Sequence, residues 1–243
     1  GVLTFRARGV LRERTTGRPA VTVSYAQTLD GRLATASGSS QWISCPDSLR
    51  FAHEQRASHD AVIVGAGTAI KDDPRLTVRR APGEDPLRVV ADSTLRTPPT
   101  AAVLAAGAAR GTVLAVTDRA LEERCEEARS LGATVVRLPE NAEGRVDLDA
   151  LLLALGGMGV ASAVVEGGAG LITGFLRARL VDRLAVCIAP KVLGSGIEAI
   201  GDLGVRELSE SLSLTETIVI PYGVDLILDS RVEYPNGSSG NGR

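Results

Sequence analysis

Two glycine-rich stretches could bring main-chain N–H groups to a phosphate. VVEGGAGLITGFL, residues 164–176, places consecutive glycines after an apolar run, and VIVGAGTAIKDDPRLTVRR, residues 62–80, places Gly65, Ala66 and Gly67 likewise. Small residues let backbone N–H groups approach a phosphate closely, and a helix that follows the first turn adds its positive end. Neither stretch has the GxGxxG spacing of an ordinary Rossmann domain, and a plain strand-to-helix turn is the simpler alternative.

Charged side chains accompany both stretches. Glu166 follows an apolar run, where a carboxylate is costly unless it meets a ligand or a partner. Asp72, Arg75 and Arg79 surround Pro74, and Arg79 could hold a phosphate through two parallel hydrogen bonds. The alternative for this second group is a solvated turn with local ion pairs.

Two further stretches carry polar groups after apolar runs. In VVADSTLR, Ser93 and Arg96 offer the hydroxyl and guanidinium that a 2′-phosphate on an adenosine ribose needs, which favours NADPH over NADH. In TLDGRLATASGSSQWIS, residues 28–44, Asp30 and Gly31 predict a tight turn. Trp42, the only tryptophan, would more often be a packing residue than a cofactor contact.

Composition limits the class of protein. The 243 residues favour one domain, and 44% hydrophobic content with a net charge of −2 is typical of a soluble globular chain without affinity for nucleic acid. Aromatic residues make up 3%, so the core is expected to be aliphatic, as in parallel sheets between helices. The sequence has no signal peptide or membrane-spanning run, which predicts a cytoplasmic protein.

The cysteines and histidines do not suggest a metal site. Cys45, Cys125 and Cys187 have no CxxC spacing, which predicts buried or half-buried thiols rather than a disulfide framework or zinc. His53 and His59 also lack metal-ligand spacing, and we interpret them as structural. No metal is therefore expected.

Strand-like and helical patterns alternate along the chain. Strands are expected at 20–26, 60–66, 87–92, 112–117, 133–138 and 161–167, and helices at 44–58, with Ser44 as N-cap, at 118–132, ending on Gly132, and at 147–157, ending at Gly156. This order predicts an α/β fold with a mostly parallel sheet. The final runs around PYG predict an antiparallel C-terminal hairpin. Residues 1–19 are expected to form a flexible basic arm, 20–234 a single domain and 235–243 a disordered tail.

The motifs together resemble one family. YAQTLDGRLATASGSSQWIS, HEQRASHDAVIVGAGTAIKDDPRLTVR, RVVADSTLRTP, VVEGGAGL and LAVCIAPKVLG, spread between about residue 20 and about residue 229, are similar to the reductase domain of the bacterial bifunctional riboflavin-biosynthesis deaminase/reductase. The resemblance implies a dihydrofolate-reductase-like fold, a homodimer, and reduction by NADPH of the ribosyl group of 5-amino-6-(5-phosphoribosylamino)uracil to ribityl.

The resemblance also implies roles for individual residues. It puts around NADPH the residues Ala26, Trp42, Thr68, Asp72, Ser93, Gly168, Ala169, Gly170 and Leu171, with the turn continuing to Gly174. It puts around the substrate the residues Ser40, Arg56, Leu76, Arg79 and Glu166. Asp72 and Glu166 are the candidate catalytic residues, Asp72 for proton transfer and Glu166 for holding substrate hydroxyl or amine groups.

The sequence departs from the family pattern in two ways. The HxE and PCxxC zinc signature of the deaminase has no counterpart, so deamination is expected to be done by another protein or not at all. Ser24 stands where the family often has a lysine, and Thr28 stands for the serine of its SLDG motif. Three alternatives therefore stay open: the 2,5-diamino pyrimidinone as substrate, a paralogue reducing another pyrimidine or pteridine, and an inactive nucleotide-binding protein.

Overall fold

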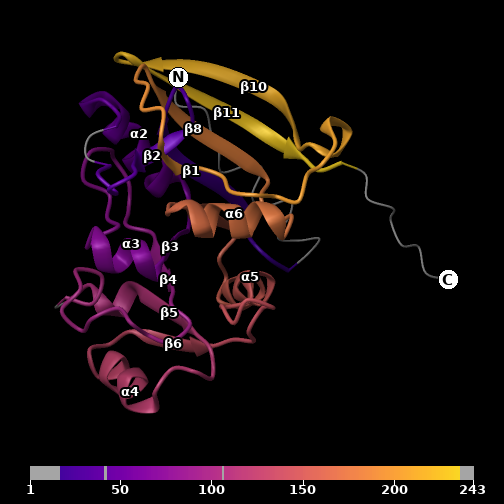
Figure 1. The fold of residues 1–243 in the computed structure, drawn as a ribbon. Coiled ribbons are helices and arrows are strands. Elements are labelled where there is room, and N and C mark those ends of the chain that lie inside the picture. The colour runs from indigo at the N-terminus through magenta and orange to yellow at the C-terminus, as the bar shows by residue number, and fades with distance from the viewer. Residues whose placement is uncertain (1–16, 41–42, 106, 236–243) are drawn as a thin grey trace.

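The computed structural model describes residues 17–40, 43–105 and 107–235, and its main element is a mixed sheet (Figure 1). The order of its strands is β10-β11-β8-β1-β7-β3-β4-β5-β6. The strands are β1 (Ala20–Thr28), β3 (Ala61–Gly65), β4 (Leu87–Ala91), β5 (Thr112–Val116), β6 (Thr134–Arg137), β7 (Ser162–Val165), β8 (Arg183–Ala189), β10 (Ser213–Tyr222) and β11 (Asp225–Glu233).

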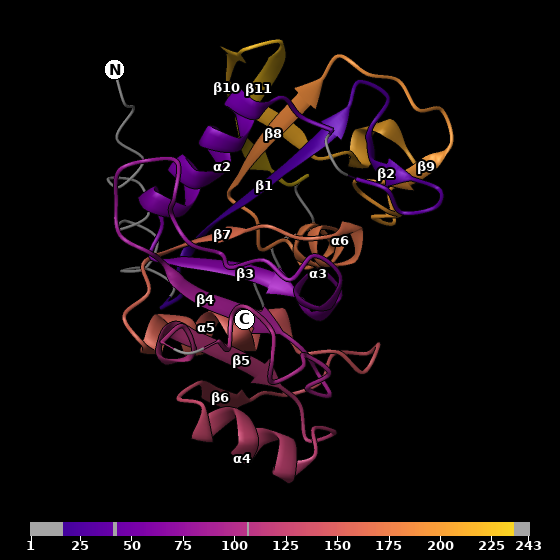
Figure 2. The same cartoon turned by 90° about the vertical axis from the view of Figure 1, so that its left-hand side faces the viewer.

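The predicted α/β class with a mostly parallel sheet is confirmed. All pairings from β8 to β6 are parallel, while β11 pairs antiparallel with β8 and β10 antiparallel with β11, which forms the expected hairpin. Figures 1 and 2 show the strands stacked from that hairpin at one end to β6 at the other. A second small sheet pairs β2 (Arg32–Thr35) with β9 (Gly196–Glu198), which the sequence pattern did not predict.

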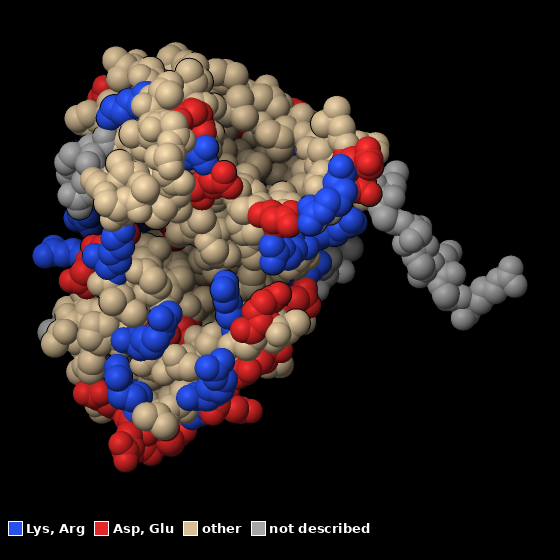
Figure 3. Space-filling view, viewed as in Figure 1, with Lys and Arg blue, Asp and Glu red and all other residues tan. Residues whose placement is uncertain are grey.

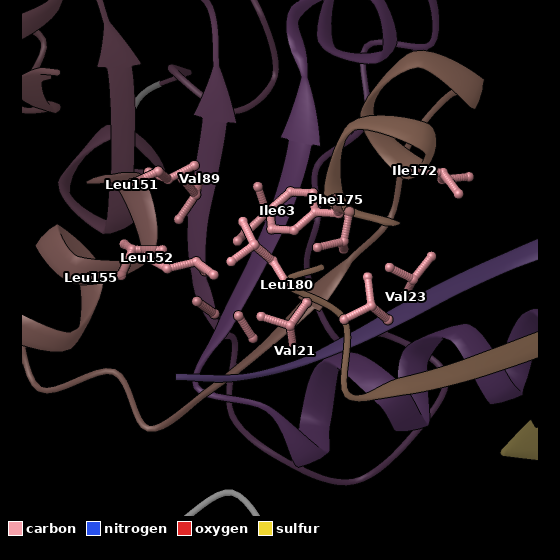
Figure 4. Packing of buried hydrophobic residues seen from close by; sticks show 14 of the residues in the cluster. Val21, Val23, Ile63, Val89, Leu151, Leu152, Leu155, Ile172, Phe175 and Leu180 are labelled. Carbon is pink, nitrogen blue, oxygen red and sulfur yellow. The ribbon is translucent and has the colours of Figure 1, made fainter. Parts of the chain in front are cut away.

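Helices cover both faces of the main sheet. They are α2 (Pro46–Ser58), α3 (Ala66–Lys71), α4 (Glu122–Ser130), α5 (Leu148–Gly157) and α6 (Ala169–Arg177), with 3₁₀ turns at Ala109–Gly111 and Leu208–Glu210. Alternate strand residues face opposite ways, so one face packs on α5 and α6 and the other on α3 and α4. Figure 4 shows the first packing layer, where Ile63 and Val89 of the sheet meet Leu152 and Phe175 of the helices.

Several expected helix ends are wrong. The stretch from Ala66, read as a turn, begins α3, and α4 begins at Glu122 rather than at residue 118. The second expected helix ends with Leu131 as its cap, and Gly132 follows it with a φ of 102°. The third ends at Gly157 with Met158 as its cap, because Gly159 is the residue that takes the left-handed φ of 84°.

Ser44 is not the N-cap of α2. Cys45 is the N-cap and its side chain makes no capping hydrogen bond. Instead the buried carboxylate of Asp225, on β11, accepts hydrogen bonds from the Cys45 N–H and the Ser48 hydroxyl, each at 2.7 Å. The carboxylate of Asp225, which is distant in sequence, lies at the positive end of α2. It therefore takes the place of an N-cap side chain.

The expected termini lie largely outside the described residues. Of the arm at 1–19, residues 1–16 are not described, while Arg18 forms an ion pair with Asp149 of α5. Of the tail at 235–243, only Pro235 is described. Among the described residues, no helix has the length and apolarity required to cross a bilayer.

Candidate active site

The candidate site is a cavity of ≈1740 Å³ at the carboxyl ends of β3, β4 and β7. In an open parallel sheet this edge is where ligands bind, because the loops that leave neighbouring strands meet there. Figure 3 shows the corresponding face hollowed near its centre, with charged side chains gathered over the half that carries β4–β6 and α4. Volumes of this size exceed what one small ligand needs, so the cavity has room for two molecules.

The cavity brings together most of the residues singled out in the sequence. Its lining includes Ala26, Ser40, Arg56, Thr68, Asp72, Leu76, Ser93, Glu166 and the turn Gly168, Ala169, Gly170 and Leu171. Arg79 does not line it, although Arg56 and Leu76 beside it do. Trp42 lies outside the described residues, so its predicted position against the nicotinamide stays a prediction.

The two glycine-rich stretches are neighbours in the fold. β3 and β7 pair in parallel, and a Cβ added at Gly167 would lie 3.9 Å from the Gly65 nitrogen. Gly168 is the N-cap of α6 and offers no side-chain cap. In the described part of the chain, the N–H groups of Ala169 and Gly170 donate to no backbone carbonyl. Two main-chain donors at the positive end of a helix therefore face the cavity.

Glu166 is paired rather than free. The guanidinium of Arg56, on α2, donates to both of its carboxylate oxygens, from Nε at 2.8 Å and from Nη2 at 2.6 Å. Both side chains are nearly buried, with 12% and 16% of their surfaces exposed. Although burial alone would lower the pKa of Arg56, Glu166 outweighs it and the pKa is raised. This ion pair with two hydrogen bonds, the Arg56–Glu166 fork, gives Glu166 the partner that a carboxylate after an apolar strand requires.

Arg79 lies in a segment without regular secondary structure that side chains of α2 hold by hydrogen bonds. The Arg79 N–H donates to Nδ1 of the buried His53 at 3.0 Å, and Arg56 Nη1 donates to the Thr77 carbonyl at 3.2 Å. Burial lowers the pKa of Arg79, and the positive charges of Arg56, Arg75 and Arg80 lower it further. A cation surrounded by cations is a binding point for an anion.

The backbone of this segment is strained at its start. Asp73 and Leu76 have φ angles of 41° and 54°, which are costly for residues with a side chain. Leu76 is fully buried and lines the cavity, and Asp73 accepts a hydrogen bond from the Ala102 N–H at 2.7 Å. Packing and this hydrogen bond therefore hold the turn around Pro74 that leads to Arg79.

The exits of β4 and β6 are joined by Ser93. Its hydroxyl accepts a hydrogen bond from the Val146 N–H at 3.0 Å, and its carbonyl accepts from Thr117. Arg96, whose side chain is 65% exposed, lies 3.8 Å from Asp92, a buried carboxylate whose Oδ1 accepts no hydrogen bond among the described residues. Ser93 and Arg96 both line the cavity, and their joint role in binding a 2′-phosphate stays a prediction.

Sequence reasoning missed three arginines that line the cavity, namely Arg119, Arg145 and Arg177 of α6. Arg119 and Arg145 follow β5 and β6, and Arg119 Nη1 donates to the Gly144 carbonyl at 3.0 Å. Arg145 Nη1 lies 3.7 Å from where a Cβ on Gly170 would be, and its guanidinium has no ion-pair partner in the described residues. The strand-exit argument applies to β5 and β6 as well and would have found Arg119 and Arg145.

The TLDG stretch is structural. Thr28 donates to Asp30 at 2.5 Å, and Asp30 accepts from the N–H groups of Leu193 and Gly194. The hydrogen bond from Thr28, with the others, lowers the pKa of Asp30 to about 2. Thr28 thus supplies the hydroxyl expected of a serine at its position. Ser24, where the family often has a lysine, lines the cavity.

The cysteines are free thiols, as expected, with Cys125 and Cys187 buried and Cys45 half-buried. Burial raises the pKa of Cys187 to about 12, so this thiol stays protonated at neutral pH. No group of three or more His, Cys, Asp or Glu side chains suited to a metal ion occurs in the described ranges.

Comparison with known proteins identifies relatives of one kind. The RibD C-terminal domain family matches residues 19–228. The 2,5-diamino-6-ribosylamino-4(3H)-pyrimidinone 5′-phosphate reductase of Methanothermobacter thermautotrophicus is 43% identical over 220 residues, covering 85% of this chain and 99% of that protein. The riboflavin biosynthesis protein RibD of Aquifex aeolicus is 40% identical, covering 87% of this chain and 57% of that protein. The chain therefore spans little more than half of the RibD relative.

Solved structures agree with these sequence relatives. Acinetobacter baumannii RibD, form 2, superposes with a TM-score of 0.80 at 28% identity, covering 93% of this chain and 61% of that one. The Saccharomyces riboflavin biosynthesis reductase Rib7 superposes with a TM-score of 0.70 at 24% identity, covering 90% and 92%, which supports the fold.

Proposed function

The chain belongs to the RibD C-terminal domain family, and we propose that it is an NADPH-dependent reductase of riboflavin biosynthesis. Its reaction converts the ribosyl group of a phosphoribosylamino-pyrimidine to ribityl. The substrate is the 2,5-diamino pyrimidinone or its uracil counterpart, which differ at one exocyclic group. The observation that carries the proposal is the cavity that joins main-chain donors at the N-terminus of α6 to the Arg56–Glu166 fork.

The donors in the cavity fit a dinucleotide pyrophosphate. Ala169 and Gly170 offer N–H groups, and a Cβ at Gly168 would meet only the Thr68 hydroxyl, at 3.9 Å. Gly168, Ala169, Gly170 and Leu171 would hold the pyrophosphate, with Thr68 beside them. Arg145 adds a positive charge next to Gly170, at the positive end of α6. A cation at a helix N-terminus is unfavourable unless an anion binds between the cation and the helix end.

The 2′-phosphate that distinguishes NADPH from NADH needs cationic and hydroxyl partners. Ser93 and Arg96 would hold it, because the Ser93 hydroxyl accepts one hydrogen bond and can still donate one. Arg119 binds the Gly144 carbonyl and so keeps the loop that carries Arg145 against the cavity. Ala26, Asp72 and Trp42 complete the proposed cofactor set on the nicotinamide side.

The substrate would lie between α2 and the exit of β7. Ser40, Leu76 and Glu166 line this part of the cavity. Arg79, three residues after Leu76, would provide the phosphate anchor. Arg56 is committed to Glu166 through two hydrogen bonds, so its role is to orient that carboxylate and to add positive potential toward the phosphate.

The chemistry divides between the cofactor and the protein. NADPH, when bound, supplies the hydride that reduces the sugar carbon, which the substrate presents in its ring-opened imine form. The protein orients the two molecules, an effect worth up to roughly 7–11 kcal/mol in well-aligned systems. Glu166 would hold substrate hydroxyl or amine groups. Asp72, exposed at the end of α3 and lining the cavity, would move a proton directly or through water.

The proposal includes a cytoplasmic homodimer. Exposed apolar side chains on the C-terminal hairpin, among them Leu214, Ile218 and Val219 of β10 and Leu226 of β11, support an interface there. Sedimentation at several concentrations tests the dimer, and a chain that stays monomeric at micromolar concentration contradicts it.

Oxidation of NADPH with each of the two pyrimidines tests the function. Turnover with either compound, and much slower turnover with NADH, is the expected result. Failure with both, combined with tight NADPH binding, would favour an inactive nucleotide-binding protein. Turnover only with an unrelated pteridine would favour a paralogue.

A further inference from the structure

His53 lies on the face of α2 that meets the segment carrying Arg79. His53 and Arg56 are three residues apart, so they share one face of the helix. Thr77 and Arg79 are two residues apart, and the Thr77 carbonyl and the Arg79 N–H both meet side chains of α2. Arg56 donates to the first of these groups and His53 accepts from the second.

The hydrogen bond defines the protonation state of His53. A backbone N–H at 3.0 Å from Nδ1 needs an acceptor there, so the imidazole is neutral and carries its proton on Nε2. Burial lowers the pKa of His53, and the positive charges of Arg56 and Arg79 lower it further, while Glu166 acts in the opposite direction. These groups face the ring from α2, the segment at residue 79 and the exit of β7.

The same hydrogen bond connects a buried side chain of α2 to the backbone of an exposed arginine. His53 is 5% exposed, whereas Arg79 is an exposed residue whose Nη1 donates to the Thr77 hydroxyl at 2.6 Å. The guanidinium is therefore held by its own segment, and that segment is held by α2 at two backbone groups. Without the bond to His53, the hydrogen bonds from α2 to residues 77–79 would, among the described residues, be reduced to the one from Arg56 to the Thr77 carbonyl.

We propose that His53 is a positioning residue for substrate binding, which fixes the backbone at Arg79 so that its guanidinium meets the phosphate of the substrate. The inference rests on the proposed function, since it assumes a phosphorylated substrate at Arg79. His53 touches neither substrate nor cofactor in this role. It supplies one lone pair, and its effect reaches the substrate only through Arg79.

Two substitutions separate the acceptor from the bulk of the side chain. In His53→Asn the amide oxygen can occupy the position of Nδ1, whereas in His53→Gln the carbonyl lies one bond farther out, near the position of Nε2. We expect KM for the phosphorylated pyrimidine to stay within about twofold of wild type in His53→Asn. In His53→Gln it should rise about five- to tenfold, which corresponds to the loss of about one hydrogen bond. KM for NADPH and kcat should change little in both.

The dephosphorylated pyrimidine gives the second readout. If His53 acts through Arg79, the wild type and His53→Gln should use the dephosphorylated compound equally well. In the double variant His53→Gln with Arg79→Ala, KM should equal that of Arg79→Ala alone, because the two changes remove one function. His59→Gln is the matched control: this half-buried histidine, the C-cap of α2, binds the Gln55 carbonyl and the Thr22 hydroxyl and should leave KM unchanged.

Additive effects of His53→Gln and Arg79→Ala on KM in the double variant would overturn the positioning role. Equal KM values for His53→Asn and His53→Gln would overturn it as well. A loss that is as large with the dephosphorylated compound would also overturn it, because a general structural defect acts on both substrates. If the wild type itself oxidises no NADPH with either pyrimidine, the proposed function fails instead, which is a distinguishable result.

Discussion

The two sides of the cavity are built differently. On the cofactor side, main-chain N–H groups at Ala169 and Gly170 and the exposed arginines Arg96 and Arg145 face the cavity with few partners of their own. On the substrate side, Arg56, Glu166 and His53 are already joined to one another or to the Arg79 segment by hydrogen bonds.

This difference follows from what each side must recognise. A pyrophosphate can be held by backbone donors that any sequence with small residues provides, so individual side chains there act independently. A sugar phosphate must be aligned with a hydride donor, and alignment needs side chains that cannot move separately. We therefore expect additive effects on the cofactor side and coupled effects on the substrate side.

The largest expected effect comes from breaking the fork. Arg56→Ala leaves Glu166 nearly buried without its cation and frees the Thr77 carbonyl, which should lower kcat/KM by about 10²–10³-fold. Steady-state kinetics with the phosphorylated pyrimidine measure it. Arg50→Ala, on the exposed face of the same helix, is the control. A decrease below about threefold in Arg56→Ala would show that the fork is not needed for turnover.

The cofactor side should respond most to a change of backbone access. Gly168 has a φ of −75° and ψ of 167°, which any residue adopts, so Gly168→Val should fold while its side chain covers the N-terminus of α6. NADPH binding should weaken by about 10–100-fold on the basis of one or two lost charge-assisted hydrogen bonds. Titration of nucleotide fluorescence measures it, with Gly157→Val on α5 as the control. Normal affinity would remove this turn from the cofactor site.

Arg79→Ala should act on one parameter only. Loss of a ground-state phosphate anchor raises KM for the substrate about tenfold and leaves kcat nearly unchanged. Arg80→Ala removes a neighbouring exposed cation and should have little effect. Initial rates over a range of substrate concentrations measure both variants. An unchanged KM in Arg79→Ala would exclude it as the anchor.

The smallest expected effects separate the two exposed arginines of the cofactor side. Arg96→Ala should raise KM for NADPH about fivefold and leave KM for NADH unchanged, because only NADPH has the 2′-phosphate. Arg145→Ala should weaken both nucleotides alike, since both carry the pyrophosphate. The double variant should show the sum of the two free-energy changes. A coupling between them comparable to either single effect would contradict independent action on this side.

Local patterns predicted most of the main sheet and the glycine-rich stretches, but not β8 (Arg183–Ala189), β2 or β9. Apolar runs between helices predicted the strands, and small residues after β3 and β7 predicted where backbone approaches a ligand, because both signals lie within a few residues. The family resemblance added Arg56, which by itself has the pattern of a solvated helix charge.

What the sequence did not provide were partners far apart in the chain. The acceptor that replaces a cap on α2 is Asp225, and the partner of Arg56 is Glu166, neither of which any local pattern specifies. His53 was interpreted as structural for the same reason, since its contact with Arg79 depends on how α2 packs. Tertiary packing determines these pairs, so only the folded chain reveals them.

A crystal structure of the protein with NADPH and the phosphorylated pyrimidine tests the account most directly. We expect the pyrophosphate against the N–H groups of Ala169 and Gly170, and the substrate phosphate on Arg79 with the Arg56–Glu166 fork intact. A nucleotide bound away from the α6 N-terminus, or a substrate phosphate held by Arg96 and Arg145, would contradict the division of the cavity into these two sides.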